Sequence, residues 1–525
     1  MHDDHPLAGS VVCFVAVALF LGLVLDLAMF SSAYILPLFV VAGAAQSAAN
    51  ESTWYAPNST WITDLSHIVN GTGVHSFIFN SSQLPAGVPY GTYDWCNMPH
   101  IRRDIYPKVN NRYKLEYVEV IHRHHKRTPY DSNLFPHEDT TWECSSGSDP
   151  IGYGPNSTPL DDSGPHAAPA YWNISTPLDH PLRSLLPSPN STCRFPQITY
   201  GGLVDSYNHG KDLRAVYGDM LGLLPARFDN SKVQFRVTNN DITTQVAGML
   251  IPGLFPSNNG HEWSRIPISD IHVSEVPLCM QPDAVDSLEP GYSCPTASSL
   301  YSSYGVGSTD PDWTAHLTAA APLYAELDAV SGVPSDDGGF HMSFDHYYDN
   351  LSARQCHAKS LPCNVDDPSQ CITQDVANGV YRLGQYEYSY IYRDAGPDTL
   401  VASSASFGIW IAELAAHLRA KMAGDTLVYR HNVAHDGSIS RLLSVLQVDV
   451  MVWPGMGAEL AFELYSDSRG GKWFIRILWG GQVFRSSNPG LGLMDMMDAD
   501  VLLGYFDDLA GVDGVDVMKR CGIEL

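Results

Sequence analysis

Residues 121–129 read Ile-His-Arg-His-His-Lys-Arg-Thr-Pro and form the most informative polar cluster in the chain. They follow Tyr-Val-Glu-Val-Ile at 117–121, a run of β-forming residues that predicts a strand ending where the cluster begins. In open α/β sheets, ligands bind beyond the carboxyl ends of the strands. The sequence therefore places three histidines and two arginines at a sheet edge where a ligand can bind.

The two arginines of this cluster, Arg123 and Arg127, flank His124. A guanidinium fork stays charged and binds phosphate oxygens in pairs. A histidine held between two such forks can attack phosphorus while the cations neutralise the transferring group. Two other interpretations stay open on spacing alone, namely a solvated basic patch and a metal cluster of His122, His124 and His125. Adjacent cations repel a metal ion, which disfavours the second of these.

A second polar segment, His431–Ser438, lies between a predicted strand at 426–429 and a predicted helix at 438–446. It too is expected at a sheet edge. His435 can hold a phosphate oxygen, and Asp436 can donate a proton to a leaving alcohol. A His-Asp pair is weak evidence by itself, since an aspartate at this position also fits the cap of the following helix.

The rest of the chain alternates between strand and helix patterns. A helix at 403–422 carries an apolar stripe spaced by three or four residues, with a glycine just beyond its end. Strands mixed with long helices favour an α/β sheet domain, with the irregular middle folded over it as a cap. The other predicted helices are 201–223 and 243–250, and the other predicted strands are 233–237, 459–465 and 473–478.

Taken together, these segments resemble the histidine acid phosphatases, fungal-type members of the phosphoglycerate mutase-like superfamily. The first segment resembles the R-H-G-x-R-x-P signature of that family, and the second resembles its late His-Asp motif. Residues 197–202 and 213–217 are similar to the helix that follows the signature, and residues 349–363 are similar to the middle of fungal-type members. The resemblance covers residues 112–525 in the family's order.

The resemblance implies a phosphoglycerate mutase-like α/β sandwich core with a smaller, mostly helical cap. It implies that His124 is the nucleophile that forms a phosphohistidine, and that Arg123 and Arg127 clamp the phosphoryl oxygens. His435 would add a hydrogen bond, and Asp436 would protonate the leaving group and then help water attack. No metal or other cofactor is expected, the substrate is a small phosphomonoester, and activity is expected at acid pH.

Two positions depart from the family pattern. His125 stands where the family has glycine next to the nucleophile. In the family, the stretch that corresponds to the one beginning here at Arg236 carries a third arginine, and Ile242 occupies its position in this chain. Losing such a contact costs about 2–4 kcal/mol of transition-state stabilisation. Arg236, Asn239 or Asn240 could substitute. Besides a broad phosphomonoesterase, the alternatives are a phytase-like enzyme and a secreted binding protein with little or no activity.

Composition narrows the class further. The chain is 44% hydrophobic and 11% aromatic, which is enough for a large core and excludes a disordered protein. Its formal net charge of −27 disfavours nucleic-acid binding, since an acidic surface repels polyanions. Nothing in the composition opposes a local basic pocket within an acidic protein.

Export is predicted from the amino-terminal region. Apolar runs at 11–30 and 34–41 lead to small residues that suit cleavage near Ala45, although a membrane anchor or a start at Met29 remains open. After cleavage we expect no stable membrane span, and a secreted product or one held at the cell surface. Nine cysteines beyond the leader predict up to four disulfides and one leftover thiol. The sequons that predict N-linked glycans are Asn50, Asn58, Asn70, Asn80, Asn156, Asn173, Asn190 and Asn350.

The predicted division of the chain follows from these patterns. A leader occupies 1–45, and a glycosylated, loop-rich arm occupies 46–110. The α/β core is split into 111–260, with an insertion at 145–195, and 401–525, and the cap lies between them at 261–400.

Overall fold

The structure is a computed structural model that describes residues 53–74, 95–144, 179–256 except 187 and 189, and 276–523. The predicted leader and most of the predicted insertion lie outside these residues. The sequons at Asn50, Asn80, Asn156 and Asn173 also lie outside them.

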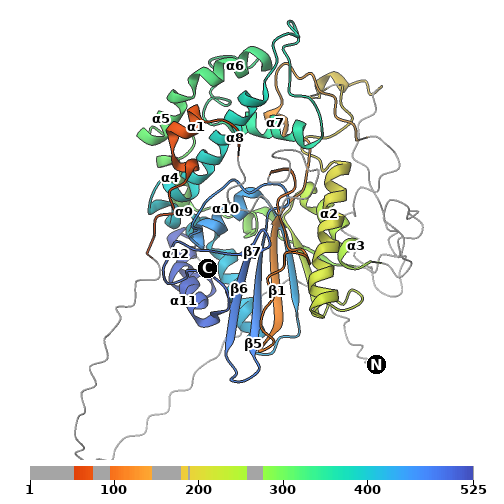
Figure 1. Cartoon of the computed structure of the whole chain (residues 1–525), viewed down its shortest axis with the longest axis vertical. Helices are drawn as coiled ribbons and strands as arrows, with labels where there is room; N and C mark the ends of the chain where they lie inside the picture. The colour runs from red at the N-terminus through yellow and green to blue at the C-terminus, as the bar shows by residue number, and fades with distance from the viewer. Residues whose placement is uncertain are drawn as a thin grey trace, which may run out of the picture. The chain divides into compact units, whose positions relative to one another are not determined.

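A mixed β-sheet forms the centre of the fold (Figure 1). In spatial order the strands are β3 (Leu278–Met280), β2 (Val233–Val237), β4 (Tyr429–Ala434), β1 (Tyr113–Arg123), β5 (Glu459–Asp467), β6 (Trp473–Trp479) and β7 (Gln482–Val483), while β8 (Met497–Asp498) pairs with β6. The first four strands of this order run parallel, and from β1 onward each neighbour is antiparallel. The carboxyl ends of β1, β2 and β4 therefore meet at one edge of the sheet.

Helices cover both faces of this sheet (Figure 1). Strand β1 shows why, because Val118 and Val120 belong to one buried apolar cluster while Tyr117 and Ile121 belong to another. A strand buried on both sides needs a layer on each side. The first layer contains α2 (Tyr200–Leu213), which continues as a π-helical turn to Met220, and α3 (Asp241–Leu254); the second contains α9 (Asp398–Met422), α10 (Asp436–Val445), α11 (Ala499–Ala510) and α12 (Val515–Arg520).

A helical cap lies beyond the sheet edge and has an apolar cluster of its own (Figure 1). The sandwich core and mostly helical cap predicted from the sequence are confirmed, whereas the domain boundaries stay a prediction. The cap contains α1 (Leu65–Asn70), α5 (Pro311–Ala319), α6 (Ala321–Ser331), α7 (Asp345–Cys356) and α8 (Gln374–Ser389), while α4 (Pro295–Tyr304) packs on α9.

Most predicted elements are found, with one shift that matters for the site. Strand β2 has the predicted bounds, but β4 begins at Tyr429, where the predicted strand at 426–429 was expected to end. The prediction was wrong because His431 and Asn432 are polar, yet both are buried inside the strand. The Asn432 side chain donates to the carbonyl of Val120 at 3.0 Å, which satisfies its amide within the sheet. The second motif therefore starts within a strand and ends on the first turn of α10.

Helix α9 is the one helix among the described residues that is long and apolar enough to cross a membrane. Within its most apolar window, 78% of the residues are buried inside the fold. Its apolar residues pack against the sheet and the helices beside it. Helix α9 is therefore the central helix of the core.

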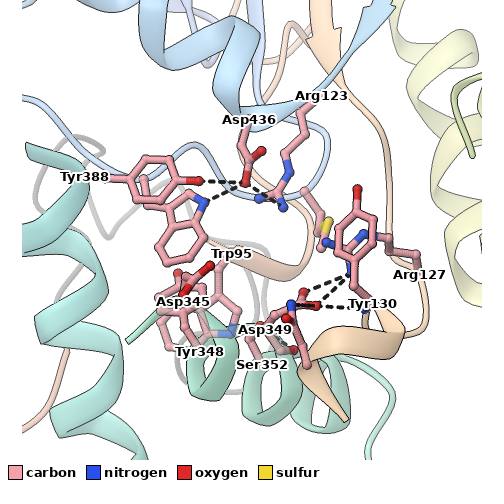
Figure 2. Close-up of a pocket in the computed structure, with 13 residues that line it drawn as sticks. Trp95, Arg123, Arg127, Tyr130, Asp345, Tyr348, Asp349, Ser352, Tyr388 and Asp436 are labelled. Atoms are coloured by element: carbon pink, nitrogen blue, oxygen red, sulfur yellow. Dashed lines mark hydrogen bonds and ion pairs between the residues drawn. The ribbon is translucent and has the colours of Figure 1, made fainter. Parts of the chain in front are cut away.

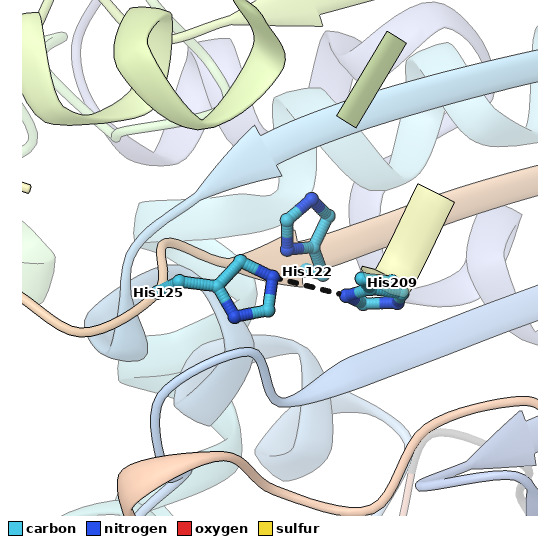
Figure 3. Close-up of side chains that lie close together, drawn as sticks. All are labelled: His122, His125 and His209. Atoms are coloured by element: carbon cyan, nitrogen blue, oxygen red, sulfur yellow. Dashed lines mark hydrogen bonds between the residues drawn. The ribbon is translucent and has the colours of Figure 1, made fainter. Parts of the chain in front are cut away.

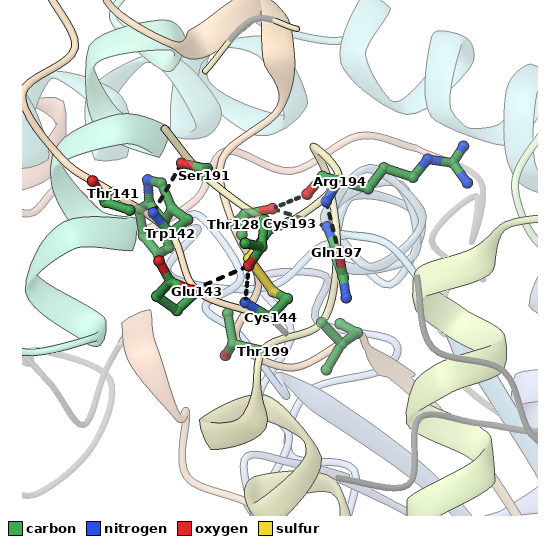
Figure 4. The surroundings of a disulfide bond; sticks show 12 residues. Thr128, Thr141, Trp142, Glu143, Cys144, Ser191, Cys193, Arg194, Gln197 and Thr199 are labelled. Atoms are coloured by element: carbon green, nitrogen blue, oxygen red, sulfur yellow. Dashed lines mark hydrogen bonds between the residues drawn. A yellow bond between two sulfur atoms is a disulfide. The ribbon is translucent and has the colours of Figure 1, made fainter. Parts of the chain in front are cut away.

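Four disulfides join described cysteines: Cys96–Cys356, Cys144–Cys193, Cys294–Cys521 and Cys363–Cys371. Figure 4 shows the second of these beside the end of the first polar segment. There the Thr128 hydroxyl donates to the carbonyl of Arg194 and accepts from the backbone N–H of Gln197, both at 2.9 Å. No described cysteine is free, so the leftover thiol predicted from the sequence is wrong for these residues.

The described sequons differ in exposure. Asn58, Asn70 and Asn190 are exposed, but Asn350 is fully buried in α7. The Asn350 amide donates to the carbonyl of Asn133, and its oxygen accepts from Arg354 Nε at 2.8 Å. A glycan on Asn350 is incompatible with this fold, so the prediction from that sequon is corrected.

Candidate active site

The predicted site residues gather at the carboxyl edge of β1 and β4. The backbone N–H of His124 donates to the carbonyl of Ala434 at 3.0 Å, and that of Gly457 donates to the carbonyl of His124 at 3.1 Å. These bonds hold the residue after β1 between the end of β4 and the loop before β5. The two polar segments, which lie more than 300 residues apart in the chain, are thereby brought together.

His124 is held as a neutral imidazole with a defined proton position. Its Nδ1 lies 3.0 Å from the carbonyl oxygen of His125. A carbonyl only accepts, so Nδ1 carries the hydrogen and the lone pair is on Nε2. Burial, together with the positive charges of Arg123 and Arg127, holds the pKa of His124 well below its usual value. The ring thus keeps a nucleophilic nitrogen even in acid.

Both arginines are buried, and each is paired with a carboxylate. Arg123 donates to the carbonyl of Pro454 at 2.6 Å, and its Nη2 lies 3.1 Å from Asp436 Oδ2. Arg127 donates to Asp349 Oδ1 at 2.9 Å and stacks on the Tyr130 ring. The Nε of each arginine is buried without a hydrogen-bond partner. An anion at this place would find two unused donors.

Asp436 opens helix α10 and receives three side-chain donors on one oxygen (Figure 2). Its Oδ2 accepts from the Trp453 indole at 2.8 Å and the Tyr388 hydroxyl at 3.2 Å, and it pairs with Arg123. Burial opposes ionisation of this carboxyl, but Arg123, the indole and Arg127 outweigh it and lower the pKa of Asp436. Without a ligand, Asp436 is therefore a carboxylate.

An aromatic stack from the cap fixes these donors. The Trp453 ring lies between the rings of Tyr348 and Tyr388, with centroids 4.0 and 3.9 Å away. Its backbone N–H donates to the side chain of Gln385 at 2.9 Å. Tyr348 belongs to α7, and Gln385 and Tyr388 belong to α8, so the position of Asp436 is set by the cap as well as by the core.

His435 follows β4 as the N-cap of α10 and lies next to His124. Its ring centroid is 5.5 Å from that of His124, and its Nε2 lies 2.9 Å from the Thr238 hydroxyl and 3.2 Å from Glu289 Oε2. Burial alone would raise the pKa of Glu289, but the hydrogen bond from His435 lowers it. Glu289 follows β3 in a loop with no recognisable motif, and sequence reasoning missed it.

The region of the missing third arginine supplies no replacement cation. Ile242 is fully buried and packs in the apolar cluster of α2 and α3. Arg236 pairs with Glu413 at 2.7 Å and with Asp286 at 3.0 Å. Asn240 caps α3 through the N–H of Ile242, and Asn239 donates to Asp283 at the surface. The three substitutes suggested by the sequence are thus engaged elsewhere.

A cavity of about 160 Å³ lies between the core and the cap (Figure 2). Of the predicted site residues, Arg123, Arg127 and Asp436 line it, whereas His124 and His435 do not. His124 is only 1% exposed and lies beside the arginines. The other lining residues are Trp95, Tyr130, Asn133, Asp345, Tyr348, Asp349, Ser352, Tyr388, Trp453 and Met456.

Sequence reasoning also missed the cap side of this cavity. Asp349 accepts from Arg127, from the backbone N–H of Tyr130 and from the Asn133 amide, and it joins the core to α7. The segment at 349–363 was matched to the family only as a stretch, without a role for this residue. A buried arginine needs a counter-charge, and that requirement is the signal that could have suggested an acidic partner.

The chain is similar to known proteins in sequence and structure. Residues 114–479 match the histidine phosphatase superfamily (branch 2). Counting factor 60 of Dictyostelium discoideum is 24% identical over 375 residues, which cover 70% of this chain and 80% of that protein. A probable acid phosphatase of the same organism is 29% identical over 158 residues, or 30% of this chain and 26% of that protein. The apo form of Hafnia alvei phytase aligns with a TM-score of 0.49 at 12% identity, covering 77% of this chain and 99% of the phytase.

Proposed function

This chain belongs to branch 2 of the histidine phosphatase superfamily, and we propose that it hydrolyses small phosphomonoesters at acid pH through a phosphohistidine on His124. One observation carries the proposal. A neutral histidine with its lone pair on Nε2 lies beside two buried arginines and a carboxylate at a sheet edge. These are the groups that phosphoryl transfer without a metal requires.

The reaction has two steps in which the same groups act in turn. Nε2 of His124 forms a bond to phosphorus as the bond to the ester oxygen breaks, and Asp436 gives its proton to the departing alcohol. Asp436 then takes a proton from water as the water oxygen bonds to phosphorus and the N–P bond breaks. Arg123 and Arg127 stabilise the charge on the phosphoryl oxygens in both steps.

Substrate binding must first open the ion pairs that close the site. His124 is almost unexposed, and Arg123 is bonded to Asp436. A phosphate that takes the guanidinium from Asp436 also removes the positive charge that lowers the pKa of that carboxyl. The pKa of Asp436 then rises, and the residue becomes the proton donor that the first step needs. Phosphate binding and acid catalysis are coupled in this way.

The pH dependence follows from the same two groups. The low pKa of His124 keeps the nucleophile neutral as the pH falls. The loss of rate at low pH is therefore expected below the pH at which an ordinary histidine is protonated. At higher pH the rate falls because Asp436 in the substrate-bound enzyme loses its proton. Activity is therefore expected between these limits, in the acid range, and should fall before neutral pH.

The cavity favours substrates with one phosphate over phytate. Its lining holds two cations, Arg123 and Arg127, against three carboxylates, Asp345, Asp349 and Asp436. After one phosphate engages the arginines, the other phosphates of an inositol polyphosphate would face carboxylates and aromatic rings. A neutral or aromatic alcohol fits these surroundings better. Phytate hydrolysis is accordingly expected to be slow.

We also propose that the protein is exported and glycosylated. Multiple disulfides are typical of the secretory pathway, and the described sequons Asn58, Asn70 and Asn190 lie on the surface. Removal of N-linked glycans from the secreted protein should lower its mass. Retention in the membrane fraction would instead favour attachment through the leader.

The test is hydrolysis of an aryl phosphate from about pH 3 to 7 by the wild type and by His124→Ala. We expect acid-range activity that falls by at least about 10³-fold in the variant, since the covalent step is lost. The variant should keep the wild-type melting temperature within a few degrees. A folded wild type without activity on aryl phosphate or phytate would reject the enzyme and favour a binding protein that lacks the third arginine.

A further inference from the structure

Five buried histidines lie together behind the segment that carries His124, and the proposed reaction uses none of them. They are His100, His122, His125, His209 and His431, and none is more than 8% exposed. The His122 ring centroid lies 4.9 Å from that of His209 and 4.8 Å from that of His431, and His100 stacks on His209 at 4.2 Å. Buried imidazole nitrogens are costly unless each has a partner.

Three of these side chains bring nitrogens close together (Figure 3). The ligand atoms of His122, His125 and His209 all lie within 4.8 Å of one another, and His125 Nε2 is 3.1 Å from His209 Nδ1. A tetrahedral zinc ion with Zn–N bonds of about 2.0–2.1 Å holds its ligand nitrogens about 3.4 Å apart. Small ring rotations would therefore place all three nitrogens around one ion.

The hydrogen bonds around the rings leave lone pairs on His122 Nε2 and His209 Nδ1. The latter accepts from His125 Nε2, a bond that a bound ion would replace. His122 Nδ1 lies 2.8 Å from the carbonyl oxygen of Arg123, so it carries the hydrogen, and Nε2 is buried without a partner. His209 Nε2 lies 2.7 Å from Glu459 Oε2, which leaves the lone pair on Nδ1. A carboxylate that holds the far nitrogen of a metal-binding histidine is a common second layer around such ions. His125 Nδ1 is also buried without a partner.

We propose that His122, His125 and His209 bind one divalent transition-metal ion of the zinc type, with Glu459 orienting His209. Charge supports the proposal. Glu459 is fully buried, and among the described residues its polar side-chain contacts are His209 and the backbone N–H of Ile101, with no lysine or arginine. A divalent cation bound to His209 would balance the charge of this buried carboxylate. Three neutral imidazoles are ligands that suit zinc.

This site differs from the metal hypothesis that the sequence allowed. That hypothesis included His124, which lies beside the arginines and is not part of this cluster. The structure adds His209, which comes from α2 and had no signal in the sequence. Because the site is enclosed, the ion is structural. It fixes His125, whose carbonyl oxygen orients the nucleophile, and so acts on His124 only through position.

The experiment measures the metal content of protein that has been purified without any chelator. Wild type secreted by a eukaryotic host in zinc-supplemented medium is dialysed against metal-free buffer and analysed by mass spectrometry. We expect about one zinc ion per chain. His209→Gln should lose it, whereas His100→Gln should keep it, because both ring nitrogens of His100 are engaged by Asp212 and the Met98 carbonyl.

A second measurement on the wild type decides the matter if His209→Gln does not fold. Protein secreted into cobalt-supplemented medium should show visible absorption bands of nitrogen-bound Co²⁺, and chelation should lower its melting temperature. Wild type with less than about a tenth of an ion per chain from either medium, and a melting temperature unaffected by chelator, would overturn the proposal. The cluster would then be a neutral hydrogen-bonded network. Either result is independent of whether the enzyme hydrolyses phosphomonoesters.

Discussion

The two sides of the segment His122–Arg127 carry different chemistry although they share one backbone. On the side of the cavity, His124 lies beside Arg123 and Arg127. On the opposite side, His122 and His125 contact other imidazoles in the buried interior. The residue type is the same on both sides. Its neighbours are cations on one side and imidazoles with a carboxylate on the other. This difference is the reason for proposing a nucleophile on the first side and metal ligands on the second.

The two sides also differ in what can move. The cavity side is held by ion pairs that a phosphate can exchange, such as Arg123 with Asp436. The interior side is closed by packing, and Gly457 lies directly against it. At this glycine φ is +73°, and an added Cβ would lie 2.6 Å from His125 Cε1. Changes on the cavity side should therefore alter the reaction, while changes on the interior side should alter stability first.

The largest effect is expected from Asp436→Asn, which changes the chemistry on the cavity side and leaves the interior side unchanged. Without a proton donor, hydrolysis of an alkyl phosphate should slow by about 10²–10⁴-fold. A nitrophenyl phosphate should slow much less, because nitrophenolate leaves without a proton. Comparing kcat for the two substrates in one preparation supplies the control. Equal losses for both would contradict the role given to Asp436.

The next effect tests the junction between the two sides. Gly457→Ala forces a methyl group against His125 and strains the backbone, and should lower the free energy of unfolding by about 1–3 kcal/mol. Gly471→Ala is the matched control, since Gly471 also has a positive φ but no atom lies within 4 Å of its added Cβ. Urea unfolding of the two variants separates crowding from backbone strain. If both variants lose the same free energy of unfolding, the close packing of Gly457 against His125 does not contribute to stability.

The smallest effect tests how the charge balance of the cavity controls phosphate binding. Asp349→Asn removes a negative charge beside Arg127 and keeps the shape of the side chain. Inhibition by inorganic phosphate near pH 6 should strengthen by about 3–10-fold, in line with roughly 1 kcal/mol for one nearby charge. Asp345→Asn, which lines the same cavity without pairing with an arginine, should change it less. A larger effect at Asp345 would mean that phosphate binds nearer the cap.

The sequence predicted the residues at the sheet edge well and those that the cap and loops bring to the site poorly, for a physical reason. Strand β2 and the signature after β1 carry local patterns, and Arg123 and Asp436 meet as the strand-to-helix order requires. The absence of a cation at position 242 was also visible from the motif and agrees with its buried apolar surroundings. Local periodicity and spacing carry this kind of information.

The partners of these residues could not be predicted in the same way. Asp349, Trp453 and Glu289 reach the site from α7 and from loops, and their contacts depend on how the cap packs on the core. His209 lies on a helix whose periodicity predicts only a buried face. Such contacts join segments that are far apart in the sequence, and no short motif predicts them. The start of β4 was misplaced because its buried polar residues have partners only in the folded sheet.

The central claim is that His124, and no other histidine of the segment, receives the phosphoryl group. The most direct test is to mix the enzyme with a ³²P-labelled aryl phosphate, quench within milliseconds in alkali, where phosphohistidine survives, and map the label by peptide mass spectrometry. The account predicts an acid-labile phosphate on His124, absent from His124→Ala and still present in Asp436→Asn. Label on His122 or His125, or a turning-over enzyme with no labelled intermediate, would contradict it.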